Sequence, residues 1–198
     1  MNHKSNNIDE QIAECKENWF VDHKAKVVTA TPEVTIIHWA NPASWNYGCH
    51  FLIHKRWLIV VGDIGEATYE WSSDLTLQFL SGIDFGYFKS KCQSSEVGRN
   101  FIDWNEYVAG KNCEEAINAI ITTKEEDRSE DDLLKLEILK EMSPGHVKQD
   151  YKEAAQEYYN KAGDGAGASE ISEMGQVAHP RCIGHFTGLQ MAIKQLSK

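Results

Sequence analysis

The sequence lacks any apolar run of the roughly 18 residues that a helix needs to cross a bilayer, which argues against a membrane-spanning protein. Its first residues have no apolar stretch typical of a secretory signal, so we expect a cytoplasmic protein. Basic residues are also in short supply, because 20 Lys and Arg stand against 30 Asp and Glu, for a formal charge of −10. Such a chain repels phosphate backbones, so we expect a partner with a basic surface rather than direct binding to nucleic acid.

The sequence contains no Cys-x-x-Cys pair and no regular cysteine spacing. Its five cysteines form an odd set, which argues against a disulfide framework and favours reduced thiols. There is also no internal repeat and no clear linker. We therefore expect one domain that spans all 198 residues.

Residues 49–92 form the predicted core. Two apolar runs, residues 49–53 and 57–61, are separated by three polar residues and followed by a Gly-Asp-Ile-Gly turn. Alternation places Cys49, Phe51 and Ile53 on one face of a strand. The pattern predicts an α+β fold with an antiparallel sheet of four or five strands covered by helices. The β-rich part is residues 25–72, and residues 74–198 are predicted to be helical, with a last helix over residues 187–196.

Two combinations of cysteine and histidine invite a chemical interpretation. His179, Cys182 and His185, at intervals of three residues, could join Cys49 and either His50 or His54 around zinc. The spacing is not that of a zinc finger, so we expect no metal and no cofactor. A cysteine nucleophile at position 49, 92 or 182 is the other possibility, but no catalytic signature surrounds any of them.

A glycine-rich segment, residues 163–169, lacks the Lys-Ser/Thr pair of a phosphate-binding loop. We expect a flexible loop there. The segment that precedes it along the chain is acidic: eight acidic residues stand against four basic ones from position 124 to 141. Such a run is usually a solvated helix face, but it could also imitate nucleic-acid charge and occupy a basic groove. The candidate contacts are Glu125, Glu126, Asp127, Glu130, Asp131 and Asp132.

Three segments resemble a group of small proteins encoded by bacteriophages and prophages. They are Val60-Val61-Gly62-Asp63-Ile64-Gly65-Glu66-Ala67, then Ser81-Gly82-Ile83-Asp84-Phe85-Gly86-Tyr87-Phe88-x-x-Lys91-Cys92, and Gly184-His185-Phe186-Thr187-Gly188-Leu189-Gln190-x-Ala192. The resemblance covers residues from about 34 to 107 and the last helix, and it leaves out residues 124–170. The group has no established activity, so no catalytic residue is carried over. The resemblance implies a phage accessory protein that acts in the cytoplasm of the host bacterium, where such proteins often disarm defences, including CRISPR systems; that last step is an analogy.

Two functions follow as hypotheses. The first is a binding protein, more plausibly than an enzyme, that inhibits a bacterial defence protein or complex through its acidic residues, as anti-CRISPR proteins do. The second is a protein that binds or degrades a signalling nucleotide in a pocket formed by Trp45, Tyr47, Asp63 and Arg99, because aromatic rings and an arginine suit a nucleotide. The sequence leaves open whether the chain forms a homo-oligomer.

Overall fold

The computed structural model describes residues 8–98, 101–142 and 147–197, and it confirms the α+β class. The chain forms two compact units. The sheet unit comprises residues 1–102 and 178–198, and the helical unit comprises residues 103–177. Each unit has its own buried core, and each is described below by itself. None of the helices among the described residues is long and apolar enough to cross a membrane.

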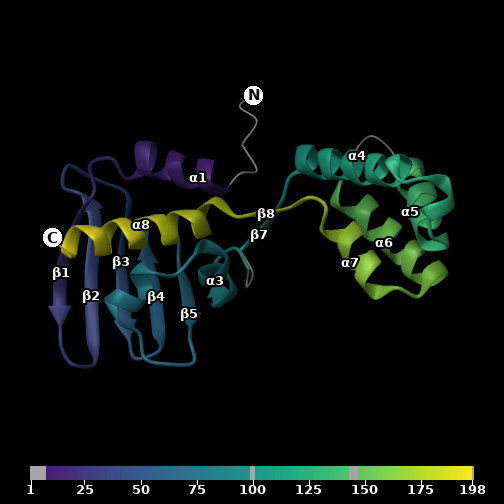
Figure 1. Cartoon of the computed structure of the whole chain (residues 1–198). Coiled ribbons are helices and arrows are strands. Elements are labelled where there is room, and N and C mark those ends of the chain that lie inside the picture. The colour runs from purple at the N-terminus through teal and green to yellow at the C-terminus, as the bar shows by residue number, and fades with distance from the viewer. Residues whose placement is uncertain (1–7, 99–100, 143–146, 198) are drawn as a thin grey trace. The chain divides into compact units, whose positions relative to one another are not determined.

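The sheet unit is built on six antiparallel strands that lie side by side in the order of the sequence (Figure 1). The prediction of four or five strands was therefore too low. The strands are β1 (Lys24–Ala30), β2 (Val34–Asn41), β3 (Ser44–His54), β4 (Trp57–Gly62), β5 (Ala67–Glu70) and β6 (Cys92–Ser95).

Helix α8 (Pro180–Leu196) crosses one face of this sheet (Figure 1). The strand residues under it are apolar at every second position, as the alternation predicts: Cys49, Phe51 and Ile53 are buried, whereas His50 and Leu52 between them are half-buried. The sheet unit is completed by α1 (Ile8–Glu14), the π-helix η1 (Cys15–Trp19), α2 (Leu77–Ser81) and α3 (Phe85–Ser90).

The chain leaves the sheet unit through β7 (Ile102–Trp104) and returns through β8 (Gln176–Ala178), and these two short strands pair with each other. Between them lies the helical unit. Its elements are α4 (Glu106–Thr122), the 3-10 helix η2 (Glu125–Asp127), α5 (Glu130–Glu141), α6 (Lys148–Ala162) and α7 (Gly165–Glu173). Its core includes Ile138, Leu139, Tyr151, Tyr158 and Ile171.

The glycine-rich segment is not the loop that we expected. Gly163 ends α6 with a φ of 71°, a left-handed conformation that glycine adopts without strain. The carboxylate of Asp164 then accepts hydrogen bonds from the backbone N–H groups of Ala166 and Gly167, both at 2.9 Å. This cap starts α7 immediately, so the glycines lie in and beside a helix N-terminus.

Candidate functional site

The acidic residues singled out in the sequence lie on two adjacent elements of the helical unit. Three of them, Glu125, Glu126 and Asp127, make up η2, and Glu130, Asp131 and Asp132 form the first turn of α5. Five of the six side chains are exposed, and Asp132 is half-buried. The structure therefore brings the six together along one short stretch of surface.

Ser129 fixes the start of α5 through a capping box. Its hydroxyl accepts a hydrogen bond from the backbone N–H of Asp132 at 3.0 Å, and the Asp132 carboxylate accepts one from the backbone N–H of Ser129 at 3.0 Å. The Ser129 hydroxyl also donates to the Asp132 carboxylate at 2.8 Å. This bond and the one from the backbone N–H of Ser129 lower the pKa of Asp132, since both favour the charged carboxylate. The helix N-terminus also favours negative charge in its first turn, so the acidic residues suit their position.

Replacing Ser129 by alanine tests this local arrangement. We expect the free energy of unfolding of the helical unit to fall by about 1 kcal/mol, a usual cost for losing an N-cap, and the pKa of Asp132 to rise toward its ordinary value. Denaturant titration followed by circular dichroism measures the first effect, and a carboxyl NMR titration measures the second. Ser129→Asp, which retains a capping acceptor, is the control. An unchanged pKa of Asp132 in Ser129→Ala would contradict the conclusion that the hydrogen bonds of Ser129 lower this pKa.

The arginine inside the acidic segment is engaged elsewhere. The Nε atom of Arg128 donates to the backbone carbonyls of Ile120 at 3.0 Å and Thr123 at 3.1 Å, and its Nη2 donates to that of Ile121 at 2.6 Å. A cation at the C-terminal end of a helix satisfies carbonyl groups that have no partner within the helix. Arg128 thus ends α4 and leaves the neighbouring carboxylates without a bridge to it.

None of the six carboxylates takes part in a salt bridge of the helical unit among the residues that the structure describes. Among the described residues, its salt bridges join Lys111 to Glu115, Lys135 to Glu170 and Lys161 to Glu157. The ammonium of Lys135, one turn after Asp132, lies 2.7 Å from the Glu170 carboxylate instead. Among the residues that the structure describes, no lysine or arginine of this unit therefore forms a salt bridge with the six carboxylates.

The charge of the whole chain is concentrated in the helical unit. Residues 103–177 contain 18 acidic and 8 basic residues, which gives −10, and the rest of the chain contains 12 of each, which gives zero. A groove of about 370 Å³ between α4 and α7 adds to the anionic character, because Glu115, Glu170 and Glu173 line it. Sequence reasoning missed this groove. The sequence signal that could have indicated it is the excess of acidic residues over positions 103–177. The boundaries of that segment, however, are known only from the fold.

The cysteines and histidines near the C-terminus belong to the core of the sheet unit. His185 is fully buried; its Nε2 donates to the backbone carbonyl of Ile64 at 3.1 Å, and its Nδ1 accepts from the hydroxyl of Tyr69 at 2.9 Å. The carbonyl can only accept, which fixes this tautomer. Burial lowers the pKa of His185 to about 4 and raises that of Cys182 to about 12. Both groups are neutral near pH 7, and the thiol is a poor nucleophile.

The suggested zinc ligands are not gathered around a common point. The ring of His179 caps α8, where its Nδ1 accepts from the backbone N–H of Arg181 at 3.2 Å. Cys49 is buried, and burial raises the pKa of its thiol well above the ordinary range. Among the residues that the structure describes, no three side chains of His, Cys, Asp or Glu are arranged to hold a metal ion.

The residues of the nucleotide hypothesis point to different partners. The ring of Tyr47 stacks on Trp19 at 4.8 Å, whereas Trp45 lies against His38 and His50. Asp63 accepts a hydrogen bond from the backbone N–H of Tyr47 at 2.7 Å, which holds that residue at a φ of 57°. Arg99 lies outside the described residues. Nothing in these contacts forms a nucleotide pocket.

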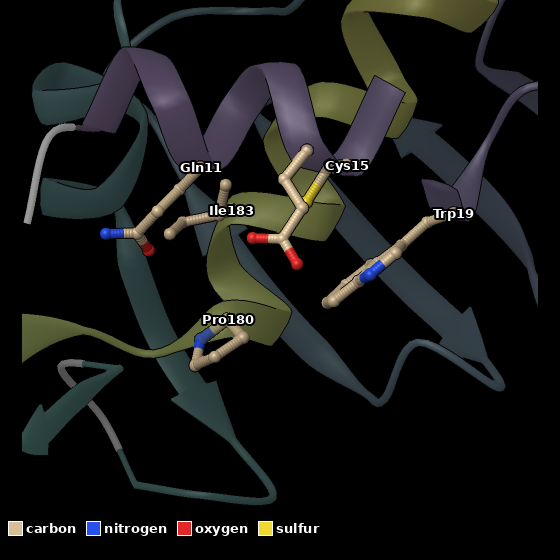
Figure 2. A pocket seen from close by; sticks show the side chains of 6 residues that line it. Gln11, Cys15, Trp19, Pro180 and Ile183 are labelled. Carbon is tan, nitrogen blue, oxygen red and sulfur yellow. The ribbon is translucent and has the colours of Figure 1, made fainter. Parts of the chain in front are cut away.

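A small cavity lies between the N-terminal helices and α8 (Figure 2). Gln11, Cys15, Trp19, Pro180 and Ile183 line it, together with Glu14. Its volume of about 80 Å³ is well below the roughly 300 Å³ at which pockets for nucleotide-sized ligands begin. The exposed carboxylates of η2 and α5 are therefore a stronger candidate site than this cavity. No family model, curated protein or solved structure matches the chain.

Proposed function

We propose that this protein is a non-enzymatic binding protein whose helical unit occupies a basic, nucleic-acid-binding surface of a partner protein. One observation carries the proposal: none of the six carboxylates of η2 and α5 forms a salt bridge among the described residues, and five of the six side chains are exposed. Carboxylates that form no salt bridge within the chain can pair with cations of a partner without breaking an ion pair.

The distribution of charge supports the same proposal. Negative charge that served only solubility would not need to be concentrated in one unit. The formal charge of −10 nevertheless falls entirely on residues 103–177. A concentrated field of one sign attracts a basic surface over about 8–10 Å at physiological salt and speeds its encounter. Since α5 is capped and Leu136, Ile138 and Leu139 anchor it in the core, its first turn presents the charges on a fixed backbone.

In the sheet unit, the state of one cysteine and one histidine favours a binding protein over an enzyme. The cysteine and histidine that could have formed a nucleophile and base are both buried and neutral. The resemblance to phage and prophage proteins supplies the biological setting. We propose that the partner is a protein or complex of bacterial defence, such as a CRISPR effector, and that binding takes place in the host cytoplasm.

Capture from a bacterial lysate tests the proposal. The full chain is immobilised, and a nuclease-treated lysate of a bacterium that carries a defence system is passed over it. We expect a nucleic-acid-binding protein to be retained, and to be released by duplex DNA or RNA at a concentration that leaves the ionic strength unchanged. Retention that added nucleic acid never reverses, over a range in which salt does, would refute the proposal.

A further inference from the structure

Two histidines face each other on the side of the sheet away from α8. His38 lies on β2 and His50 directly opposite it on β3, as Cα partners in the antiparallel register. Both are half-buried, in contrast to Ile37, Trp39, Cys49 and Phe51, their buried neighbours along the strands. The pair therefore lies on the open face of the sheet unit, where small ions from solvent can reach it.

The ring nitrogens of the pair already converge. The Nδ1 atom of His38 lies 3.1 Å from the Nε2 atom of His50. Two imidazole nitrogens bound to one ion at 2.0–2.1 Å and separated by this distance subtend an angle of about 100° at the metal. That angle is close to the cis angle of tetragonal copper and to the tetrahedral angle of zinc. The contact is a hydrogen bond, so the ring that donates must first move this proton to its other nitrogen before both nitrogens can bind the ion.

Lys26 and Trp45 flank the pair. Lys26 is the Cα partner of His38 on β1. The ring of Trp45 covers the pair from one side, with its centroid 5.4 Å from that of His38 and 5.7 Å from that of His50. Trp45 is 46% exposed, so the cover leaves access from solvent.

We propose that His38 and His50 form a two-histidine site for a divalent transition-metal ion, with Cu²⁺ bound more tightly than Ni²⁺ or Zn²⁺. Water completes the coordination, since no third protein ligand lies at the pair among the described residues. The order of affinities follows from the general preference of nitrogen ligands. The site is separate from the proposed function, because it belongs to the sheet unit and uses no acidic residue of η2 or α5.

Copper titration of single-residue variants tests this site. The variants are His38→Gln, His50→Gln and, as a matched control, His54→Gln, whose exposed side chain is on the same strand as His50. All carry His3→Ala, so that this histidine, which lies outside the described residues, supplies no imidazole ligand to Cu²⁺. We expect His38→Gln and His50→Gln each to weaken Cu²⁺ binding about tenfold or more in calorimetry, since each removes half of the protein ligands. His54→Gln should leave the affinity unchanged.

Three spectroscopic measurements make the outcome independent of any loss of folding. In the His3→Ala chain, electron paramagnetic resonance should show Cu²⁺ with two imidazole nitrogens, and Zn²⁺ should shift the ring ¹⁵N resonances of His38 and His50 together. Quenching of Trp45 fluorescence by Cu²⁺ should disappear in Trp45→Phe while the affinity stays. A single nitrogen ligand, or Zn²⁺ that leaves both rings unshifted, would overturn the site.

Discussion

Neutralising the six carboxylates of η2 and α5 is expected to weaken binding to the captured partner about tenfold or more. An exposed ion pair contributes roughly 0.2–1 kcal/mol, so six of them amount to roughly 1–6 kcal/mol, and tenfold corresponds to 1.4 kcal/mol. The change replaces each carboxylate by its amide, which retains the shape of the side chain. The positions are Glu125, Glu126, Asp127, Glu130, Asp131 and Asp132.

The control for this variant removes the same number of charges from the sheet unit. Six exposed carboxylates there are replaced by amides, so both variants have a formal charge of −4 instead of −10. The control positions are Glu10, Glu17, Asp22, Glu33, Glu66 and Asp74. Affinity is measured by calorimetry at several salt concentrations. The slope of log affinity against log salt should fall in the first variant and stay nearly constant in the control. Equal losses in the two variants would mean that net charge alone, and not this surface, governs binding.

The second large effect concerns acid. The free energy of unfolding of the sheet unit should fall by about 3 kcal/mol between pH 7 and pH 4 through His185 alone. Burial lowers the pKa of this imidazole from 6.5 to about 4 in the folded chain. Between these values the unfolded chain binds a proton that the folded chain does not, so stability rises with pH across this window and is fully present above it.

Denaturant titrations at a series of pH values measure this effect. Five of the six tryptophans are in the sheet unit, so fluorescence reports mainly on its unfolding. In His185→Gln, the free energy of unfolding should fall less between pH 6.5 and pH 4. The difference should be most of the roughly 3 kcal/mol that we assign to His185. Part of the slope should remain, because burial also lowers the pKa of His23. A slope in His185→Gln equal to that of the unsubstituted chain would contradict the buried, neutral state of His185.

The sheet was largely predictable because its strands alternate between buried and half-buried positions. Cys49, Phe51 and Ile53 face the core as the period of two requires. The sixth strand was missed because its sequence, Cys-Gln-Ser-Ser, has no apolar alternation and only its pairing with β5 makes it a strand. The helix α7 was missed for a related reason: glycines predict a loop, but the cap at Asp164 and the burial of Ile171 stabilise a helix.

The candidate site was visible in the sequence only as a run of charge. Whether those carboxylates are free depends on contacts that sequence does not give. Arg128 is adjacent to them in the chain, yet its guanidinium binds carbonyls at the end of α4. Lys135 is one turn away, yet it bridges to Glu170, which is 35 positions further along the chain. The nucleotide hypothesis assumed that residues near in sequence share a pocket. Trp45 and Tyr47 are near in sequence, but their rings contact different neighbours.

The most direct test of the central proposal is displacement of nucleic acid from the purified partner. A fluorescently labelled duplex is bound to the partner, the full chain is added, and fluorescence anisotropy is followed at constant ionic strength. We expect the unsubstituted chain and the sheet-unit control to release the duplex at similar concentrations, while the variant without the six carboxylates needs about tenfold more. A ternary complex, in which the chain binds the partner and the duplex stays bound, would contradict the proposal.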